Sequence, residues 1–206
     1  YAQAGAMLSK TAHAALEAGL TGMEFAAGIP GCVGGAVVMN AGAYGGEMKD
    51  VLTSVEYLAA DGNIVEVPAA ELDLSYRHSI FEENGGCILS ATFRLKKGDA
   101  ASIKARMDEL MQKRTDKQPL DKPSAGSTFK RPAGAFAAAL IDQCGLRGYR
   151  HGGAAVSEKH CGFVINRKNA TSADVAGLIQ KVTETVQEKF GVTLEPEVIF
   201  LGDFEK

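Results

Sequence analysis

An arginine and a serine in two separate motifs have side chains suited to chemistry on a carboxylate-bearing substrate. Arg77 lies among aromatic residues, directly after Tyr76 and shortly before Phe81. A guanidinium stays charged at any working pH and can bind a carboxylate through two hydrogen bonds. Ser127 stands in a glycine-flanked loop among cations, where its hydroxyl could donate a proton if the alkoxide were stabilised. Surface exposure of Arg77 and a turn or helix-capping role for Ser127 remain open.

A carboxylate near the C-terminus is the third candidate group. Glu195 and Glu197 flank Pro196 in a segment that reads as a strand, so their side chains are expected to point the same way. Apolar residues follow at 198–200. Partial desolvation would raise the pKa of a carboxylate there, which would suit it to act as a general acid or to orient a substrate. The alternative is an exposed glutamate at a sheet edge.

The most unusual segment is a glycine run at 28–36, continued by a second one at 40–46. Glycine has no Cβ, so its backbone can come close to a flat ring or a phosphate. The run differs from the dinucleotide-binding fingerprint, because no strong strand precedes it and Pro30 interrupts the spacing. Tight turns between packed elements would explain such a run equally well.

The composition limits the classes of protein to consider. The chain has 206 residues, 46% of them hydrophobic, which is enough to bury a core. Its net charge of -3 argues against a nucleic-acid binder. Its apolar runs fall short of the roughly 20 residues that cross a bilayer, so we expect no membrane span. Four separated cysteines without a C-x-x-C pair predict neither a disulfide framework nor a metal site.

Charge is uneven along the chain, and one stretch between 113 and 131 is rich in cations. Such a stretch could attract an anionic small molecule, although a solvated surface is as good an interpretation. The cations of this stretch are Lys113, Arg114, Lys117, Lys122, Lys130 and Arg131.

Hydrophobic periodicity predicts helices over 6–18, 102–114, 134–143 and 172–190. Alternation predicts a β-hairpin over 51–59 and 64–67 with its turn at Asp61-Gly62, and further strands at 87–95, around Ala155 and Phe163, and at 194–201. Helices and strands are mixed without a strict βαβ alternation, which favours an α+β fold. The stretch 96–99 is the expected junction between two domains, 1–97 and 98–206.

Four of these motifs occur together in the order found in one known family. They are the glycine run with residues 40–45, Tyr76-Arg77-His78-Ser79, Gly126-Ser127-Thr128-Phe129-Lys130 and Leu194-Glu195-Pro196-Glu197-Val198. Together they resemble the UDP-N-acetylenolpyruvoylglucosamine reductases, and the resemblance covers nearly the whole chain. The short interval from Arg77 to Ser127 resembles the compact type of that family, which lacks an inserted loop over the substrate.

The resemblance implies the second half of a PCMH-type FAD-binding domain (1–97), followed by a C-terminal α+β substrate-binding domain (98–206). It implies an enzyme of peptidoglycan synthesis that reduces UDP-N-acetylglucosamine enolpyruvate to UDP-N-acetylmuramate. NADPH would reduce FAD, and hydride would then pass from flavin N5 to C3 of the enolpyruvyl group. We expect a cytoplasmic monomer whose partners are small molecules, the UDP-sugar and NADPH.

The resemblance also implies a role for individual residues. Arg77 and Glu197 would stabilise negative charge at C2 of the substrate, and Ser127 would protonate C2, aided by the charge of Lys130. The substrate-binding residues would be Tyr76, Arg114, Lys117, Lys122 and Lys130. The flavin-binding residues would be Gly28, Ile29, Pro30, Gly31, Val33, Gly34, Gly35, Asn40, Gly42 and Ala43.

Two departures from the family pattern stand out. Cys32 occupies a position where the glycine run more often has serine, which should be tolerated because the run acts mainly through its backbone. The chain opens at Tyr1, without an initiator methionine, and the family's N-terminal lobe that clasps the flavin pyrophosphate is not in it. We therefore expect the 206 residues by themselves to bind FAD weakly or not at all and to be inactive.

Two other functions remain open. One is a related oxidase that acts on a sugar or alcohol with covalently attached flavin, although the glycine run offers no histidine for attachment. The other is an idle binding module that recognises a UDP-sugar without a redox step. Consumption of NADPH in the presence of the enolpyruvyl substrate would separate both from the reductase.

Overall fold

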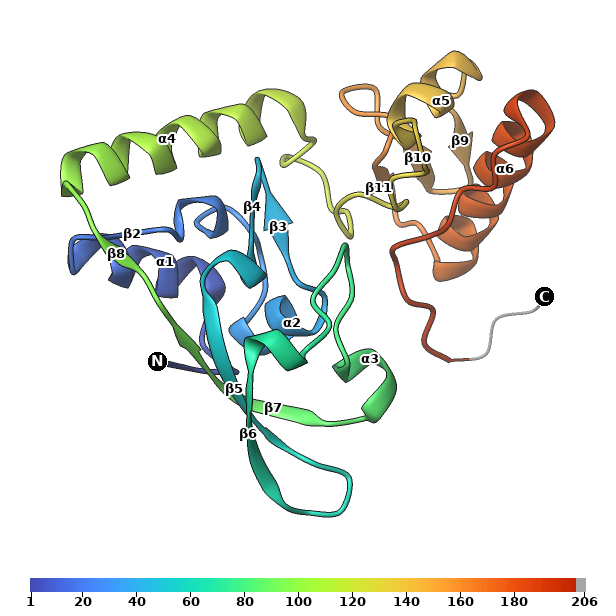
Figure 1. Cartoon of the computed structure of the whole chain (residues 1–206). Helices are drawn as coiled ribbons and strands as arrows, with labels where there is room; N and C mark the ends of the chain where they lie inside the picture. Colours follow the sequence, from blue (N-terminus) through green and yellow to red (C-terminus); the bar gives the residue numbers. More distant parts are fainter. Residues whose placement is uncertain (203–206) are drawn as a thin grey trace. The chain divides into compact units, whose positions relative to one another are not determined.

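The computed structural model describes residues 1–202, and the chain divides into a first unit, Tyr1–Lys113, and a second unit, Arg114–Lys206 (Figure 1). Each unit buries a hydrophobic core of its own. The predicted domain limits, 1–97 and 98–206, stay a prediction. Among the described residues, no helix has the length and apolar character needed to cross a membrane.

An antiparallel sheet of four strands forms the centre of the first unit, in the order β1-β7-β5-β6. The strands are β1 (Ala2–Gln3), β5 (Leu52–Leu58), β6 (Ile64–Pro68) and β7 (Cys87–Phe93). The predicted hairpin is confirmed as β5 and β6. Asp61 accepts a hydrogen bond from the Asn63 amide at 3.0 Å, and Gly62 has a φ of +88°. These are the turn residues that such a connection favours.

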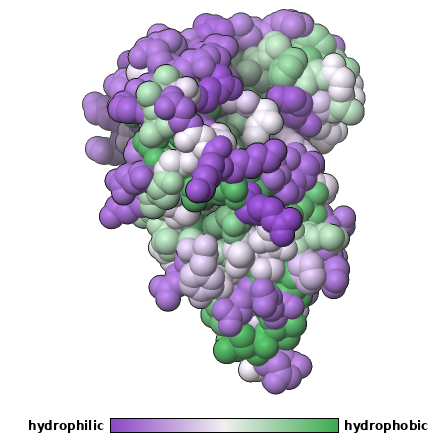
Figure 2. Space-filling view, turned by 60° about the vertical axis from the view of Figure 1, so that its left-hand side comes forward, coloured by the Kyte–Doolittle hydropathy of each residue, from purple (hydrophilic) through white to green (hydrophobic). Residues whose placement is uncertain are grey.

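The tip of this hairpin exposes apolar side chains. Leu58, Ile64 and Val65 are 39, 62 and 36% exposed. Figure 1 shows the hairpin reaching away from the rest of the first unit, and Figure 2 shows hydrophobic residues at that end of the molecule.

Two helices of the first unit pack near the sheet. Helix α1 (Leu8–Glu17) buries Leu8, Ala12 and Ala15, which lie at helical spacing. Helix α2 (Val33–Val38) packs against β1 and β7. The sequence predicts α1 but not α2, because glycine is a poor helix former. The amides of Val33 and Gly34 bond to the carbonyls of Ala6 and Ala4, both at 2.9 Å, so the helix begins where a neighbouring segment fixes it.

Short elements complete the first unit. The strand pairs are β2 (Leu20–Thr21) with β8 (Lys96–Lys97), and β3 (Gly42–Ala43) with β4 (Gly46–Glu47). The connections between strands also contain short helices. They are α3 (Phe81–Asn84) and the 3-10 helices η1 (Glu24–Ala26), η2 (Met48–Asp50) and η3 (Ala69–Glu71). Both members of the β2–β8 pair belong to the first unit.

Helix α4 (Ala100–Lys117) is longer than the sequence predicts and runs past the division between the units. Ile103 and Met107 on its buried face belong to the core of the first unit. Its exposed face carries ion pairs one turn apart, such as Lys113 with Glu109 at 2.6 Å. Glu109 also bonds to Arg106, and the two cations lower the pKa of its carboxyl.

The second unit packs two helices near a small antiparallel sheet in the order β11-β10-β9. The strands are β9 (Arg150–His151), β10 (Ala154–Val156) and β11 (Val164–Asn166). The helices are α5 (Ala137–Gln143) and α6 (Ser172–Phe190). The start and end of α6 are confirmed: Thr171 and Asp174 form a capping box, and Gly191 is left-handed at a φ of +67°.

Two sequence predictions in the second unit are wrong. Helix α5 begins at Ala137 rather than at 134, because Gly134 has a φ of +70°, outside the helical range. The described residues 194–201 form no strand and make only an isolated bridge between Pro196 and Phe129. The ladder stops there because the amide of Thr128, which would bond to the carbonyl of Glu197 in a longer ladder, bonds to the carbonyl of Gly162 at 2.8 Å instead.

Candidate active site

Arg77 lies at the tip of a two-residue turn in the first unit. The amide of Ser75 bonds to the carbonyl of His78 at 3.2 Å, and the amide of His78 bonds back at 3.3 Å. Arg77 has a φ of +55°, and its guanidinium stands 5.1 Å from the ring centroid of Tyr76. Its side chain is half-buried, whereas Tyr76 is exposed. The turn therefore presents a cation and a phenol ring together.

Two carboxylates lie close to His78, the residue after Arg77. The imidazole of His78 lies 3.1 Å from Glu82 and 3.5 Å from Asp73. The hydrogen bond to Glu82 raises the pKa of His78, which favours its protonated form.

The glycine run serves two structural purposes. Gly34 and Gly46 are packing positions, because an added Cβ would come within 2.9 Å of Ala4 and 2.8 Å of Phe25. Gly31 and Gly45 are open positions: they have φ values of +121° and +88°, and an added Cβ would meet no atom within 4 Å. Glycine is favoured there by its conformation, and its bare backbone leaves space on that side.

The other predicted flavin-binding residues lie in or beside this run, all in the first unit. Val33 and Gly34 are buried in α2, whereas Gly35 is exposed on the same helix. Gly28, Ile29 and Pro30 lie in the loop before α2, and Gly42 and Ala43 form β3. Asn40 is fully buried. Its side-chain nitrogen donates to the carboxylate of Glu47, and its side-chain oxygen accepts a bond from the backbone amide of Lys49.

Ser127 and Glu197 lie on two paired segments of the second unit. The amide of Glu197 bonds to the carbonyl of Thr128 at 2.8 Å, and the amide of Lys130 bonds to the carbonyl of Glu195 at 2.9 Å. Glu197 thus lies opposite the residue next to Ser127. Ser127 is exposed, and its hydroxyl makes a long contact of 3.4 Å with the carbonyl of Phe129.

The predicted substrate-binding cations of the second unit differ in their surroundings. Lys130 forms an ion pair of 2.5 Å with Glu195, so part of its charge is already compensated. Lys122 lies 3.5 Å from Asp121 on the surface. Arg114 is half-buried and Lys117 exposed, both near the end of α4.

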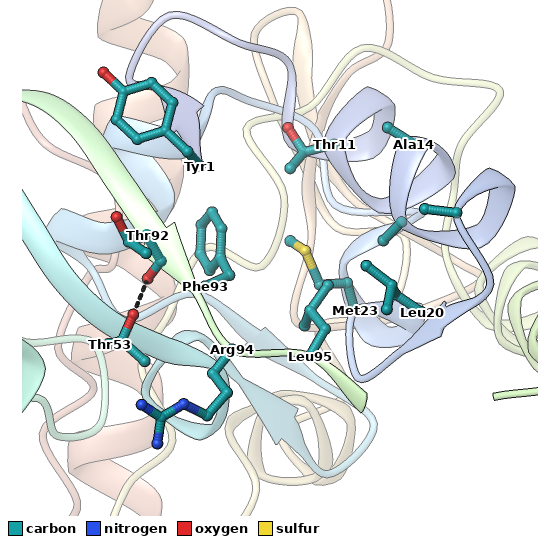
Figure 3. A pocket seen from close by; sticks show the side chains of 12 residues that line it. Tyr1, Thr11, Ala14, Leu20, Met23, Thr53, Thr92, Phe93, Arg94 and Leu95 are labelled. Atoms are coloured by element: carbon teal, nitrogen blue, oxygen red, sulfur yellow. Dashed lines mark hydrogen bonds between the residues drawn. The ribbon is translucent and has the colours of Figure 1, made fainter. Parts of the chain in front are cut away.

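A cavity of about 350 Å³ lies beside these segments in the second unit. Thr128 and Val198, the neighbours of Ser127 and Glu197, line it, together with Val175 and Ile179 of α6. A cavity of about 540 Å³ in the first unit lies between α1 and the end of β7 (Figure 3). None of the predicted site residues lines that larger cavity, so it plays no part in the predicted site.

Sequence reasoning gave no role to a polar cluster in the second unit. Arg147 holds both carboxylate oxygens of Asp142, at 2.9 and 2.6 Å, and also bonds to the carbonyl of Glu158. The guanidinium lowers the pKa of Asp142, and burial raises the pKa of the nearby Cys161 thiol. Burial also lowers the pKa of His160. The bond from Arg147 to the carbonyl of Glu158 ties the loop that carries Glu158 to the end of α5.

The two units divide the predicted catalytic residues between them. Ser127 and Glu197 lie near each other in the second unit, and Arg77 belongs to the first. The convergence of all three on one substrate stays a prediction. Within residues 1–202, no cluster of His, Cys, Asp or Glu side chains could hold a metal ion.

Comparison with known proteins matches both parts of the chain. Residues 1–68 match the model of an FAD binding domain, and residues 118–201 match that of the UDP-N-acetylenolpyruvoylglucosamine reductase C-terminal domain. This order, with mixed helices and strands in both units, confirms the predicted fold class.

Curated relatives and a solved structure agree with these matches. The UDP-N-acetylenolpyruvoylglucosamine reductase of Agathobacter rectalis is 61% identical over 98% of this chain, which spans 65% of that protein. The corresponding protein of Pediococcus pentosaceus is 54% identical over 98% of the chain and 67% of its own length.

The crystal structure of the Thermus caldophilus UDP-N-acetylenolpyruvylglucosamine reductase (MurB) superposes with a TM-score of 0.84 at 40% identity, over 94% of this chain and 70% of that one. The chain thus spans about two thirds of the length of these relatives. It belongs to the UDP-N-acetylenolpyruvoylglucosamine reductase family.

Proposed function

We propose that this chain carries the catalytic groups of an NADPH-dependent flavoenzyme that reduces UDP-N-acetylglucosamine enolpyruvate to UDP-N-acetylmuramate, a cytoplasmic precursor of peptidoglycan. The observation that carries the proposal is the 61% identity to a curated reductase along nearly the whole chain, with the motif residues in place. The overall reaction adds a hydride at C3 and a proton at C2 of the enolpyruvyl group.

The glycine run fits a flat cofactor. The backbones at Gly31 and Gly45 are open on the side where a side chain would stand, so a ring can approach them closely. These residues and the exposed Gly35 would hold FAD, with the loop at 28–30 beside them. When bound, FAD supplies the chemistry of accepting a hydride from NADPH and delivering it to C3.

Arg77 would bind the carboxylate of the enolpyruvyl group. Addition of hydride at C3 leaves negative charge on C2 and on this carboxylate, and a fixed guanidinium stabilises that charge as it develops. The turn already presents the guanidinium next to Tyr76, and the side chain is half-buried. Tyr76 would contact the same end of the substrate.

Ser127 would donate the proton to C2. Its contact with the Phe129 carbonyl is long, at 3.4 Å, so the hydroxyl can turn toward a substrate at little cost. A serine hydroxyl is a weak acid, so this step needs a strongly basic acceptor such as a carbanion. Glu197 lies opposite Thr128, the residue after Ser127, and would orient the reacting carbon and the Ser127 hydroxyl.

The cations near the end of α4 and in the following loop would bind the negatively charged phosphates of the UDP-sugar. Arg114, Lys117 and Lys122 are the candidates, with Lys130 closer to the reacting end. Lys117 and Lys122 are exposed and therefore available to an anion from solvent.

The test is an assay of NADPH consumption that depends on the enolpyruvyl substrate. Because the chain spans about two thirds of its relatives' length, the assay compares it with a chimera that adds the remaining residues of the A. rectalis reductase. We expect the chimera to consume one NADPH per product formed. A chimera that binds the UDP-sugar and FAD yet consumes no NADPH would refute the proposal in favour of a binding module.

A further inference from the structure

The Arg77 turn needs support from outside itself. Arg77 has a φ of +55°, a conformation that residues with a Cβ rarely adopt and that persists where the surroundings impose it. Within the turn, two long backbone hydrogen bonds join Ser75 and His78, at 3.2 and 3.3 Å. Residues that contact the two ends of the turn add to these bonds.

Asn40 fixes the first end. Its side-chain nitrogen donates to the carbonyl of Ser75 at 2.9 Å and to the carboxylate of Glu47 at 2.7 Å. Its side-chain oxygen accepts a bond from the amide of Lys49 at 2.9 Å. Asn40 is fully buried and has a positive φ of its own, +41°. An amide is suited to this position because it donates twice and also accepts.

Ser79 fixes the second end. Its hydroxyl donates to the carbonyl of Val38 at 2.5 Å, and the residue is fully buried. Val38 is the last residue of α2, and Asn40 follows that helix by two residues. Both ends of residues 75–79 are thus tied to the same short stretch, 38–40, at the end of the glycine run.

We propose that Asn40 and Ser79 are positioning residues, which hold the Arg77 guanidinium at a fixed place relative to the open glycines of the cofactor loop. This inference rests on the proposed function and deepens it. The carboxylate held by Arg77 and the carbon that receives hydride belong to the same three-carbon group, so a small displacement of the turn moves that carbon away from the hydride donor. The side chain of Asn40 thereby acts through Arg77.

The inference distinguishes Asn40 from a residue that binds the cofactor directly. A direct flavin contact should affect reduction by NADPH and transfer to the substrate alike. A positioning residue for Arg77 should affect only the half-reaction in which the enolpyruvyl carboxylate is bound.

The experiment measures both half-reactions separately in the flavinated chimera. Asn40→Asp keeps the size of the side chain but removes both donors, and Ser79→Ala removes the bond at the other end. We expect each variant to slow reoxidation of the flavin by the enolpyruvyl substrate about ten- to a hundredfold, with flavin reduction by NADPH nearly unchanged. Asn63→Asp, the same change at the exposed hairpin turn of the same unit, is the matched control and should behave as wild type.

A double-mutant cycle then tests whether Asn40 acts through Arg77. In an Arg77→Ala background, Asn40→Asp should cause little further loss, because the group it positions is gone. Full additivity, or equal slowing of both half-reactions, would overturn the inference while leaving the proposed reaction intact. Absence of substrate-dependent turnover in the wild type would instead refute the proposed function.

Hydrogen exchange provides a readout that does not depend on activity. In Asn40→Asp and Ser79→Ala, exchange of the His78 amide, which closes the turn, should be about tenfold faster than in wild type and in Asn63→Asp. Unchanged exchange in both variants would show that the two side chains do not hold the turn and would overturn the inference. This measurement also decides the matter if one of the two variants fails to fold.

Discussion

The Arg77 turn of the first unit and the Ser127 segment of the second unit are held by different kinds of hydrogen bond. The turn is fixed by two buried side chains, those of Asn40 and Ser79, which bond to backbone carbonyls. The Ser127 segment is held mainly by its backbone, through bonds of Thr128 and Lys130 with the segment at 195–197. The Lys130–Glu195 ion pair and a bond from the Val164 amide to the Thr128 hydroxyl add to these.

The difference shows how far each region tolerates substitution. The geometry around Arg77 depends on side chains, so a single change can loosen it. The hydroxyl of Ser127 makes a long contact of 3.4 Å with the carbonyl of Phe129 and takes no part in the backbone bonds that hold its segment. It can therefore be replaced with little structural damage, and its variants report on chemistry more directly.

The largest expected effect is that of Ser127→Ala. Loss of a proton donor should slow formation of product about 10²- to 10⁴-fold, while reduction of flavin by NADPH stays nearly intact. Stopped-flow absorbance of the flavin in the chimera follows the two half-reactions separately. Ser172→Ala, an exposed serine at the start of α6, is the control. Equal losses in both half-reactions would point to a binding or structural role.

Arg77→Lys should have the next largest effect. A lysine keeps the positive charge but cannot bind a carboxylate through two parallel bonds, so we expect the substrate half-reaction to slow about 10²-fold. Arg94→Lys, at an exposed arginine of the same unit, should leave the rate unchanged. A wild-type rate for Arg77→Lys would mean that a charge in this place suffices and that the strained turn has another purpose.

Substitutions at two adjacent glycines of α2 should have different effects, one on packing and the other on cofactor binding. Gly34→Ala places a Cβ 2.9 Å from that of Ala4 and should cost about 1–3 kcal/mol of stability. Gly35→Ala meets only Cys32, at 3.7 Å, and should raise stability by about 0.5 kcal/mol while weakening FAD binding. Thermal unfolding and flavin titration of the chimera measure the two effects. Unaltered FAD affinity in Gly35→Ala would exclude Gly35 from the cofactor site.

The smallest expected effect concerns stability. The contribution of His78 in the first unit and that of His160 in the second should depend on pH with opposite signs. The hydrogen bond to Glu82 raises the pKa of His78 above its ordinary 6.5, so its contribution to stability is complete below 6.5 and is lost as pH rises through the folded pKa. Burial lowers the pKa of His160, so its contribution is present above 6.5 and is lost as pH falls through its folded pKa. NMR titration of the two imidazoles should give midpoints on opposite sides of 6.5, and Glu82→Gln should lower that of His78.

Local sequence signals predicted several elements correctly. Thr171 and Asp174 at one end of α6 and Gly191 at the other are capping residues within the helix's own neighbourhood. The β5–β6 hairpin likewise depends on Asp61 and Gly62 at its turn. Helix α2 could not be predicted in this way, because its glycines disfavour a helix and the bonds from Val33 and Gly34 to residues 4 and 6 impose it.

The prediction of a strand at 194–201 was wrong. The pattern of residues suits a strand, but the amide of Thr128 bonds to the carbonyl of Gly162 rather than to that of Glu197, so the segment pairs with Phe129 by one isolated bridge. This bridge nevertheless brings Glu197 next to the Ser127 segment. The sequence offered the two residues as candidates through a family resemblance, and their adjacency comes from pairing between distant parts of the second unit.

By itself, the sequence determined the family, the types of the candidate catalytic residues and the helices and hairpin whose ends carry local signals. These follow from residue identity and from interactions over a few positions along the chain. The tertiary structure alone decided that Asn40 supports a turn 35 residues away, that Gly34 is buried while Gly35 is open, and that Glu197 lies opposite Thr128. Such facts depend on which distant segments pack together, and no local pattern encodes that packing.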